Sequence, residues 1–347
     1  MPDPLPFIID CDTGIDDSLA LLYACASPEA SIVGVTCVGG NVDAQQVALN
    51  TRAVLELAGR EDIEVALGRE TPLVRPVQTA PETHGPRGLG YAELPAPRRP
   101  LSDRHAADLI IEEARRRPGE LTLITIGPLT NLGLAVLREP ELPRLLRRWV
   151  LMGGSYRSAG NTAPTTEWNI HCDPEAAKVA FTAFAKPGLA ARPLALGLDV
   201  TERAKFTPEH MGRLARRSGS QPDETLGDGG RESSSIASNP IVRFTADALR
   251  FYMEFHSRYD GFYGAFIHDP LAVAAALDPS LVRAEAVTVD VELGGTLTTG
   301  ETVTDWRRVW GRPPNLDVAV EANAEEFLDR FVERVGGLAE RLVNVAS

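Results

Sequence analysis

The sequence has few of the features that would indicate a secreted, membrane-bound or nucleic-acid-binding protein. Its four cysteines show no CxxC spacing, so neither a zinc site nor a disulfide framework is supported. No apolar run approaches the roughly 20 residues that span a bilayer, and the first residues do not form a signal peptide. The formal net charge of -13 repels phosphate backbones and anionic membranes. We therefore expect a cytoplasmic protein that binds neither nucleic acid nor a membrane.

Short apolar runs alternate with longer segments of helical period. The runs at 5–9, 31–38, 63–66, 121–126, 149–152 and 194–198 predict buried strands, and the segments at 16–26, 44–58 and 102–117 predict helices. Strands that alternate with helices of this length indicate a parallel sheet covered on both faces. The prediction is one α/β domain over 1–347, with an open, mostly parallel, Rossmann-like sheet and helices on both faces.

The stretch 218–239 departs from this pattern, because it is rich in serine, glycine and acidic residues and has no apolar period. Such a composition predicts a mobile loop. Long loops inside compact domains are often lids over a site. A variable surface insertion explains the stretch equally well.

Four carboxylates, Asp10, Asp12, Asp16 and Asp17, follow the first predicted strand within eight residues. Asp10 and Asp12 project from the same face of an extended chain, and Gly14 permits the turn that brings Asp16 and Asp17 into the next helix. Capping and the helix dipole account for about two of the four. Acids this close raise one another's pKa unless a cation lies among them. The cluster therefore predicts a hard divalent cation with oxygen ligands.

Other predicted strands end in small or amide-bearing residues, with Gly-Gly-Asn at 39–41, Gly-Pro-Leu-Thr-Asn at 127–131 and Gly-Gly at 153–154. Each is an ordinary turn by itself. Together they place possible ligand contacts at the carboxyl edge of the sheet, where open α/β sheets bind ligands. The polar loop 160–169 adds two amides, a carboxylate and an indole, which can bind hydroxyl groups and stack on a flat ring, although a solvated loop is an equal interpretation.

An imidazole and a carboxylate, His268 and Asp269, precede Pro270 at a predicted helix start. Asp173-Pro174 has the same local pattern, so local evidence favours Asp269 as a plain N-cap. A histidine taken alone, such as His268 or His84 in its glycine-rich loop, is more often structural than catalytic.

Together these motifs resemble the nucleoside hydrolase family, the inosine-uridine-preferring N-ribohydrolases, over nearly the whole chain. The DxDxxxDD element at 10–17, GPLTN at 127–131, the stretch from Gly160 to 177 that reads GN…ExN…DPEAA, and the late His-Asp-Pro occur in the expected order. The segment 314–320 is similar to the family's C-terminal strand. The aromatic stretch 251–263 is similar to its mobile wall over the base, with no single residue assigned.

The resemblance implies the nucleoside hydrolase fold and Ca²⁺-dependent hydrolysis of the N-glycosidic bond of ribonucleosides, which releases free base and ribose. It implies attack by metal-activated water through an oxocarbenium-like transition state, with Asp12 as general base and His268 acting at the departing base. The implied Ca²⁺ ligands are Asp12, Asp17, Asp269 and the backbone carbonyl of Ile126, and Asp10 would orient them. The implied substrate-binding residues are Asp16, Asn41, His84, Met152, Asn161, Glu167, Trp168 and Asn169.

The resemblance also implies a homodimer or homotetramer, and it leaves the choice between purine and pyrimidine open. Two other functions remain possible from the residues. A phosphatase of the haloacid dehalogenase type also has DxD after a strand, but Gly14 stands where that family has Thr or Val, and its late acidic pair would fall in 227–232 with no strand before it. A non-catalytic nucleoside- or ribose-binding protein could have kept the same pocket.

Overall fold

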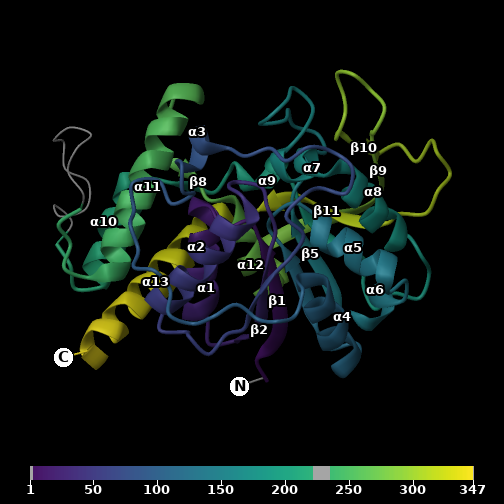
Figure 1. Cartoon of the computed structure of the whole chain (residues 1–347). Coiled ribbons are helices and arrows are strands. Elements are labelled where there is room, and N and C mark those ends of the chain that lie inside the picture. Colours follow the sequence, from purple (N-terminus) through teal and green to yellow (C-terminus); the bar gives the residue numbers. More distant parts are fainter. Residues whose placement is uncertain (1–2, 222–234, 347) are drawn as a thin grey trace.

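The computed structural model describes residues 3–221 and 235–346 (Figure 1). Within these residues the main sheet has nine strands, in the order β10-β9-β11-β6-β5-β4-β1-β2-β3. β9 pairs antiparallel with β10 and β11 at one edge, and the other neighbouring strands run parallel. The strands of this sheet are β1 (Leu5–Cys11), β2 (Ala30–Cys37), β3 (Val65–Leu67), β4 (Thr122–Thr125), β5 (Arg148–Met152), β6 (Leu194–Leu196), β9 (Val282–Val291), β10 (Thr302–Asp305) and β11 (Leu316–Ala322). Two further strands, β7 (Lys205–Phe206) and β8 (Ala265–Phe266), form a small antiparallel pair.

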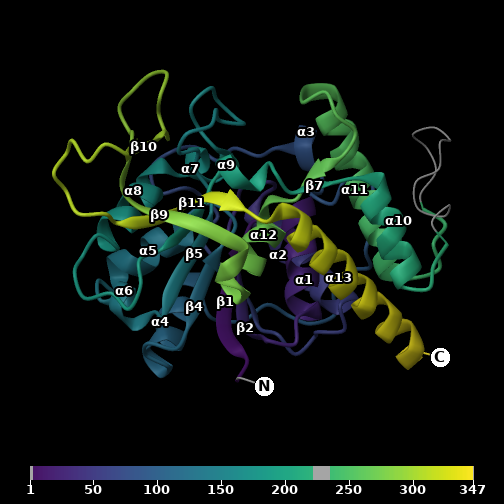
Figure 2. The same ribbon diagram turned by 180° about the vertical axis from the view of Figure 1, so that it is seen from behind.

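Helices cover both faces of the main sheet. Side chains alternate along β1, so Phe7 and Ile9 join one hydrophobic cluster and Ile8 joins the other. The first cluster includes α1 (Ile15–Ala26), α2 (Ala44–Leu57), α10 (Pro208–Arg217), α11 (Pro240–Tyr259), α12 (His268–Leu277) and α13 (Ala324–Ala346), and Figure 2 shows α10, α11 and α13 together on one side. The second includes α4 (Ala106–Arg116), α5 (Thr130–Arg138), α6 (Leu142–Leu145), α7 (Trp168–Cys172) and α8 (Pro174–Ala183). The remaining helices are α3 (Pro81–His84), α9 (Leu198–Thr201) and a 3₁₀ turn at Pro279–Leu281.

The predicted α/β class, with its mostly parallel sheet and helices on both faces, is confirmed. The predicted bounds differ from the observed ones by at most two residues, except at the start of α4, which lies four residues later than predicted. β3 begins two residues after the start of the apolar run at 63–66, and β6 ends at Leu196 because α9 begins at Leu198. The helix expected at 102–117 begins only at Ala106, because the His105 side chain accepts a hydrogen bond from the Ala107 N–H as its N-cap. Most of the predicted loop or lid at 218–239 lies outside the described residues.

The strand order indicates where the sheet can bind a ligand. β1 lies between β4 and β2, and the chain turns from β1 toward β2 and later returns to β4 on the other side. The helix after β1 covers one face and the helix after β4 covers the other. A crevice between the carboxyl ends of two such strands is the usual ligand site of an open α/β sheet. Here the crevice is bordered by the residues that follow Cys11 and Thr125.

Candidate active site

The turn after β1 is closed by the carboxylate of Asp17. Its Oδ1 accepts a hydrogen bond from the Asp12 N–H at 3.1 Å, and its Oδ2 accepts from the Gly14 N–H at 2.9 Å. The Asn41 side-chain amide donates to the same Oδ2 at 3.1 Å. The carboxylate thus caps the start of α1, as the dipole argument expects, and joins the ends of β1 and β2.

The Asp12 carboxylate is packed against backbone. The Asn41 N–H donates to its Oδ2 at 2.8 Å, whereas its buried Oδ1 has no hydrogen-bond partner among the described residues. A Cβ on Gly40 would lie 2.2 Å from Oδ2, and one on Gly127 would lie 2.7 Å from Oδ1. The glycines at two strand ends are therefore explained by the close approach of this carboxylate.

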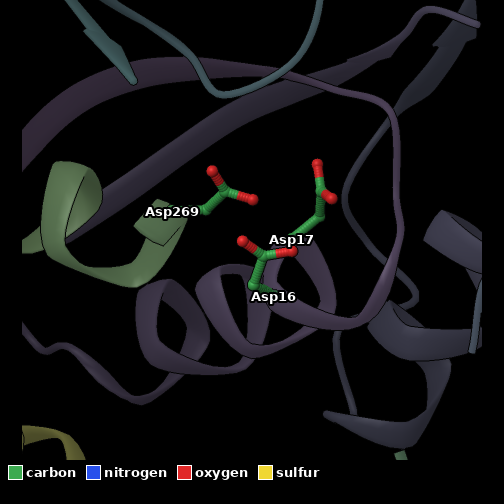
Figure 3. Close-up of side chains that lie close together, drawn as sticks. All are labelled: Asp16, Asp17 and Asp269. Carbon is green, nitrogen blue, oxygen red and sulfur yellow. The ribbon is translucent and has the colours of Figure 1, made fainter. Parts of the chain in front are cut away.

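Three carboxylates, Asp16, Asp17 and Asp269, converge beside this turn (Figure 3). One oxygen of each lies within 4.8 Å of the others, and all three side chains are buried. Burial raises the pKa of Asp269 first, and repulsion from Asp16 and Asp17 raises it further. The pKa of Asp16 rises to about 8 and that of Asp17 to about 6, again chiefly through burial. A bound cation would reduce the repulsion between these carboxylates and lower their pKa values.

The structure corrects one local prediction and adds a position for Asp16. α12 begins at His268 with Ile267 as its N-cap, so the local prediction that Asp269 caps the helix is wrong, and its side chain joins the acidic cluster instead. Asp16, which the resemblance implied for ribose binding, belongs to the converging trio, whereas Asp12 borders it. Burial and then the charge of Asp17 raise the pKa of Asp12.

Asp10 lies behind this cluster and is fully buried. Its Oδ1 accepts hydrogen bonds from the Thr36 hydroxyl at 2.6 Å and from the Asn131 amide at 2.8 Å, and burial raises its pKa to about 7. Asn131 also donates to the Cys37 carbonyl at 3.0 Å. From the sequence this amide was expected near a ligand, but it is fully buried and contacts Asp10 instead.

A cavity of about 580 Å³ opens over the acidic cluster. Eleven of the predicted site residues line it: Asp16, Asn41, His84, Ile126, Met152, Asn161, Glu167, Trp168, Asn169, His268 and Asp269. The other three, Asp10, Asp12 and Asp17, lie buried beneath it.

The loop before α7 supplies one wall of the cavity. The Glu167 carboxylate caps α7 by accepting hydrogen bonds from the Asn169 and Ile170 N–H groups, and it also accepts from Gly154 at 2.9 Å. Burial still raises its pKa. The Asn169 amide donates to the carbonyls of Ile126 at 3.0 Å and Met152 at 3.2 Å, so it joins the ends of β4 and β5.

Two buried imidazoles also line the cavity. His84 Nδ1 accepts a hydrogen bond from the Ile15 N–H at 3.2 Å, and His268 Nδ1 pairs with the Thr201 hydroxyl at 2.8 Å. Burial lowers the pKa of each histidine to about 3. Both rings are therefore neutral near pH 7 and interact through hydrogen bonds rather than charge.

Sequence reasoning missed Glu202 and His256 among the lining residues, and it included Tyr252 and Phe255 only as part of the aromatic wall. Glu202 stands at the end of α9, and Tyr252, Phe255 and His256 stand on α11. Phe255 and His256 follow Tyr252 by three and four residues, so these three side chains share one face of α11. An apolar core explains the same spacing. The aromatic stretch was assigned to the wall as a whole, and His256 was overlooked within it.

The acidic residues lie at the crevice between β1 and β4, beneath a polar cavity that is also lined by imidazoles. This arrangement is typical of the active site of an α/β enzyme. Residues 7–329 match the family model described as inosine-uridine preferring nucleoside hydrolase, and the chain belongs to this family. It is therefore an N-ribohydrolase, a glycosidase that acts on ribonucleosides.

Curated relatives support the assignment. The chain is 36% identical over 332 residues to the pyrimidine-specific ribonucleoside hydrolase RihA of Photobacterium profundum, which covers 95% of this chain and 98% of that protein. It is 36% identical over 340 residues to the inosine-uridine preferring nucleoside hydrolase of Leishmania major, with 96% and 99% covered.

A solved structure agrees with the fold. The purine-preferring ribonucleoside hydrolase from Gardnerella vaginalis superimposes with a TM-score of 0.85 at 30% identity, over 97% of this chain and 99% of that one. The names of these similar proteins include both purine and pyrimidine preferences. Within the described residues, no helix combines the length and the low polarity that crossing a bilayer requires.

Proposed function

We propose that the chain hydrolyses the N-glycosidic bond of ribonucleosides with the help of Ca²⁺ held by the acidic cluster. The convergence of Asp16, Asp17 and Asp269 at the base of the cavity carries this proposal. The cluster offers carboxylate oxygens, and Ile126, which would add its backbone carbonyl, lines the same cavity; a hard cation prefers such oxygen donors. The Oδ1 of Asp12, for which the described residues provide no hydrogen-bond partner, also fits a cation or its water.

In this proposal two members of the converging trio, Asp17 and Asp269, ligate the cation together with the neighbouring Asp12 and the Ile126 carbonyl, while the third member, Asp16, faces the ribose. Asp10 would help to orient the ligands, and its own side chain is held by Thr36 and Asn131. Calcium, when bound, would lower the pKa of a water molecule and contact the ribose diol. Asp12 Oδ1 would take the proton of the attacking water. Asp16, Asn41, Met152, Asn161, Glu167 and Asn169 would hold the ribose.

The charge of the site favours the transition state over the substrate. Glycosidic cleavage places positive charge on the ribose ring as the bond breaks, and the buried carboxylates of Asp16 and Glu167 line the same cavity. A negative group that stabilises this charge does little for a neutral substrate, so its interaction energy lowers the barrier. His84 and Trp168 would lie beside the base.

The departing base is a poor anion and needs a hydrogen-bond donor. His268 lines the cavity and is neutral because burial lowers its pKa. If the Thr201 hydroxyl donates to Nδ1, the ring proton is on Nε2, which can then polarise the base. The cytoplasmic location and the homodimer or homotetramer stay predictions of the sequence.

A panel of inosine, adenosine, guanosine, uridine and cytidine tests the activity and also determines the base preference. Release of free base is measured for the chelated protein and again after Ca²⁺ is added, and Ca²⁺ binding is measured by calorimetry. We expect Ca²⁺ to bind and to restore turnover. Tight ribose binding without turnover would favour a binding protein, and phosphate release from a phosphomonoester would favour the phosphatase, whose late acidic residues at 227–232 lie outside the described residues.

A further inference from the structure

His256 is a buried imidazole in the wall of the cavity for which the proposed reaction has no role. It stands near the end of α11, and its side chain lines the cavity. Its Nδ1 pairs with the Asp260 carboxylate at 2.7 Å. Its Nε2 is buried and has no hydrogen-bond partner among the described residues. A buried polar atom left unpaired in this way is destabilising, and a ligand that donates a hydrogen bond to it would remove the penalty.

The end of α11 fixes Asp260 in place. The helix ends at Tyr259, and Asp260 is its C-cap, with its own N–H donating to the His256 carbonyl at 2.8 Å. The carboxylate and the imidazole are four residues apart and therefore lie on the same side of the helix. A carboxylate can only accept a hydrogen bond, so the proton of the neutral ring lies on Nδ1 and Nε2 keeps its lone pair.

Aromatic rings hold the His256 ring on several sides. The ring centroids of Tyr252 and Phe266 lie 4.6 and 4.7 Å from that of His256, and Phe262 stacks on it at 5.6 Å. Burial lowers the pKa of His256 below its ordinary value, although Asp260 opposes the shift. The imidazole is thus neutral and fixed, and its Nε2 is a defined hydrogen-bond acceptor.

The His84 ring is protonated on the opposite nitrogen from the His256 ring. Its Nδ1 accepts from the Ile15 N–H, so the proton of its neutral ring lies on Nε2. Both histidines line the cavity and both pack on Tyr252, at 5.5 Å for His84 and 4.6 Å for His256. The two imidazoles can therefore offer one hydrogen-bond donor and one acceptor to the same flat ligand.

We propose that His256, positioned by Asp260, recognises the nucleobase by accepting a hydrogen bond at Nε2 from an N–H or amino group on the edge of the base. This inference rests on the proposed function, because it takes the cavity to be the nucleoside site. Suitable donors are the ring N–H of inosine or uridine. A p-nitrophenyl riboside has no such donor on its leaving group.

The test compares kcat/KM for inosine, uridine and p-nitrophenyl riboside in the wild type and in His256→Phe. We expect the loss for the two nucleosides to exceed the loss for the p-nitrophenyl riboside by about 10- to 100-fold, the effect of one unpaired buried hydrogen bond. His256→Gln keeps an acceptor oxygen and should restore part of the difference. Ser257→Ala, on the exposed side of the same helix, is the matched control and should leave the ratio unchanged.

Asp260 acts through His256, so its test needs a different measurement. ¹⁵N chemical shifts of the His256 ring should show a protonated Nδ1 and a bare Nε2 in the wild type, and Asp260→Ala should abolish this preference. The same variant should reduce the ratio between nucleosides and p-nitrophenyl riboside. A wild-type ring protonated at Nε2 would overturn the proposal.

The two proposals fail in different ways. If the wild type, supplied with Ca²⁺, hydrolyses none of the three substrates, the proposed function is wrong. If it hydrolyses all three and His256→Phe lowers each kcat/KM by the same factor, or by none, the proposed function stands and only the role of His256 is refuted.

Discussion

Replacing Gly40 with alanine should disable the site without adding or removing any charge. The new Cβ would lie 2.2 Å from Asp12 Oδ2, 3.0 Å from Asp12 Cγ and 2.9 Å from Pro128 Cγ. Ordinary contact begins at 3.4 Å, so the carboxylate oxygen must retreat by about 1.2 Å. The Asn41 N–H now donates to this oxygen at 2.8 Å, and that hydrogen bond would break.

The expected effect is large because Asp12 is the proposed base and a proposed ligand. A misplacement of about 1 Å costs about 10²-fold in rate, which is about 2.7 kcal/mol of transition-state stabilisation. Overpacking should also destabilise the fold by about 1–3 kcal/mol. We therefore expect kcat/KM for inosine and for p-nitrophenyl riboside to fall by about 100-fold or more, and the Ca²⁺ concentration for half-saturation to rise.

Gly39→Ala provides the matched control. Its Cβ would meet its nearest atoms, the Ala44 nitrogen and the Glu70 carbonyl oxygen, at 3.5 Å, which is ordinary contact. This variant should keep kcat/KM within about threefold of the wild type, since volume-compatible changes are tolerated. Circular dichroism and thermal melting establish that both variants are folded, and calorimetry measures Ca²⁺ binding directly. Normal kinetics and Ca²⁺ affinity in Gly40→Ala, or equal losses in both variants, would refute the reasoning.

Four further outcomes are expected. Asp12→Asn should reduce turnover by at least about 10²-fold because the proton acceptor is lost, and near-normal kcat would remove Asp12 as the base. Chelation should abolish activity and Ca²⁺ should restore it; activity indifferent to a chelator would exclude the metal. In the folded protein the pKa is raised from the ordinary 3.8 to about 6 for Asp17, about 7 for Asp10 and about 8 for Asp16. In the chelated protein their contribution to stability is therefore present below pH 3.8 and is lost as the pH rises through the three folded-state values. The melting temperature of the chelated protein should therefore fall between about pH 5 and pH 8, and Ca²⁺ should cancel the fall; a flat profile would contradict the shifts. His268→Ala should lower kcat/KM for nucleosides far more than for p-nitrophenyl riboside, whose leaving group needs no donor, and equal losses would remove its role at the base.

Local sequence determined the scaffold and the first half of the site. The apolar runs and helical periods predicted the parallel sheet because side-chain periodicity directly reflects burial on one face or two. The spacing of Asp10, Asp12, Asp16 and Asp17 predicted a cation site because a strand, a turn and a helix start have fixed local geometry. Asp173 was likewise predicted as an N-cap, and its side chain does accept a hydrogen bond from the Ala176 N–H.

Only the tertiary structure decided what the local patterns left ambiguous. Asp269 has the same local pattern as Asp173, yet its side chain joins Asp16 and Asp17 because α12 packs against α1. Asn131 looked like a ligand residue but is buried against Asp10, and His256, which the sequence analysis overlooked, lines the cavity. The roles of Asp269 and Asn131 depend on contacts with residues more than a hundred positions away in the sequence. The direction of such side chains is set by packing, which no local window of the sequence contains.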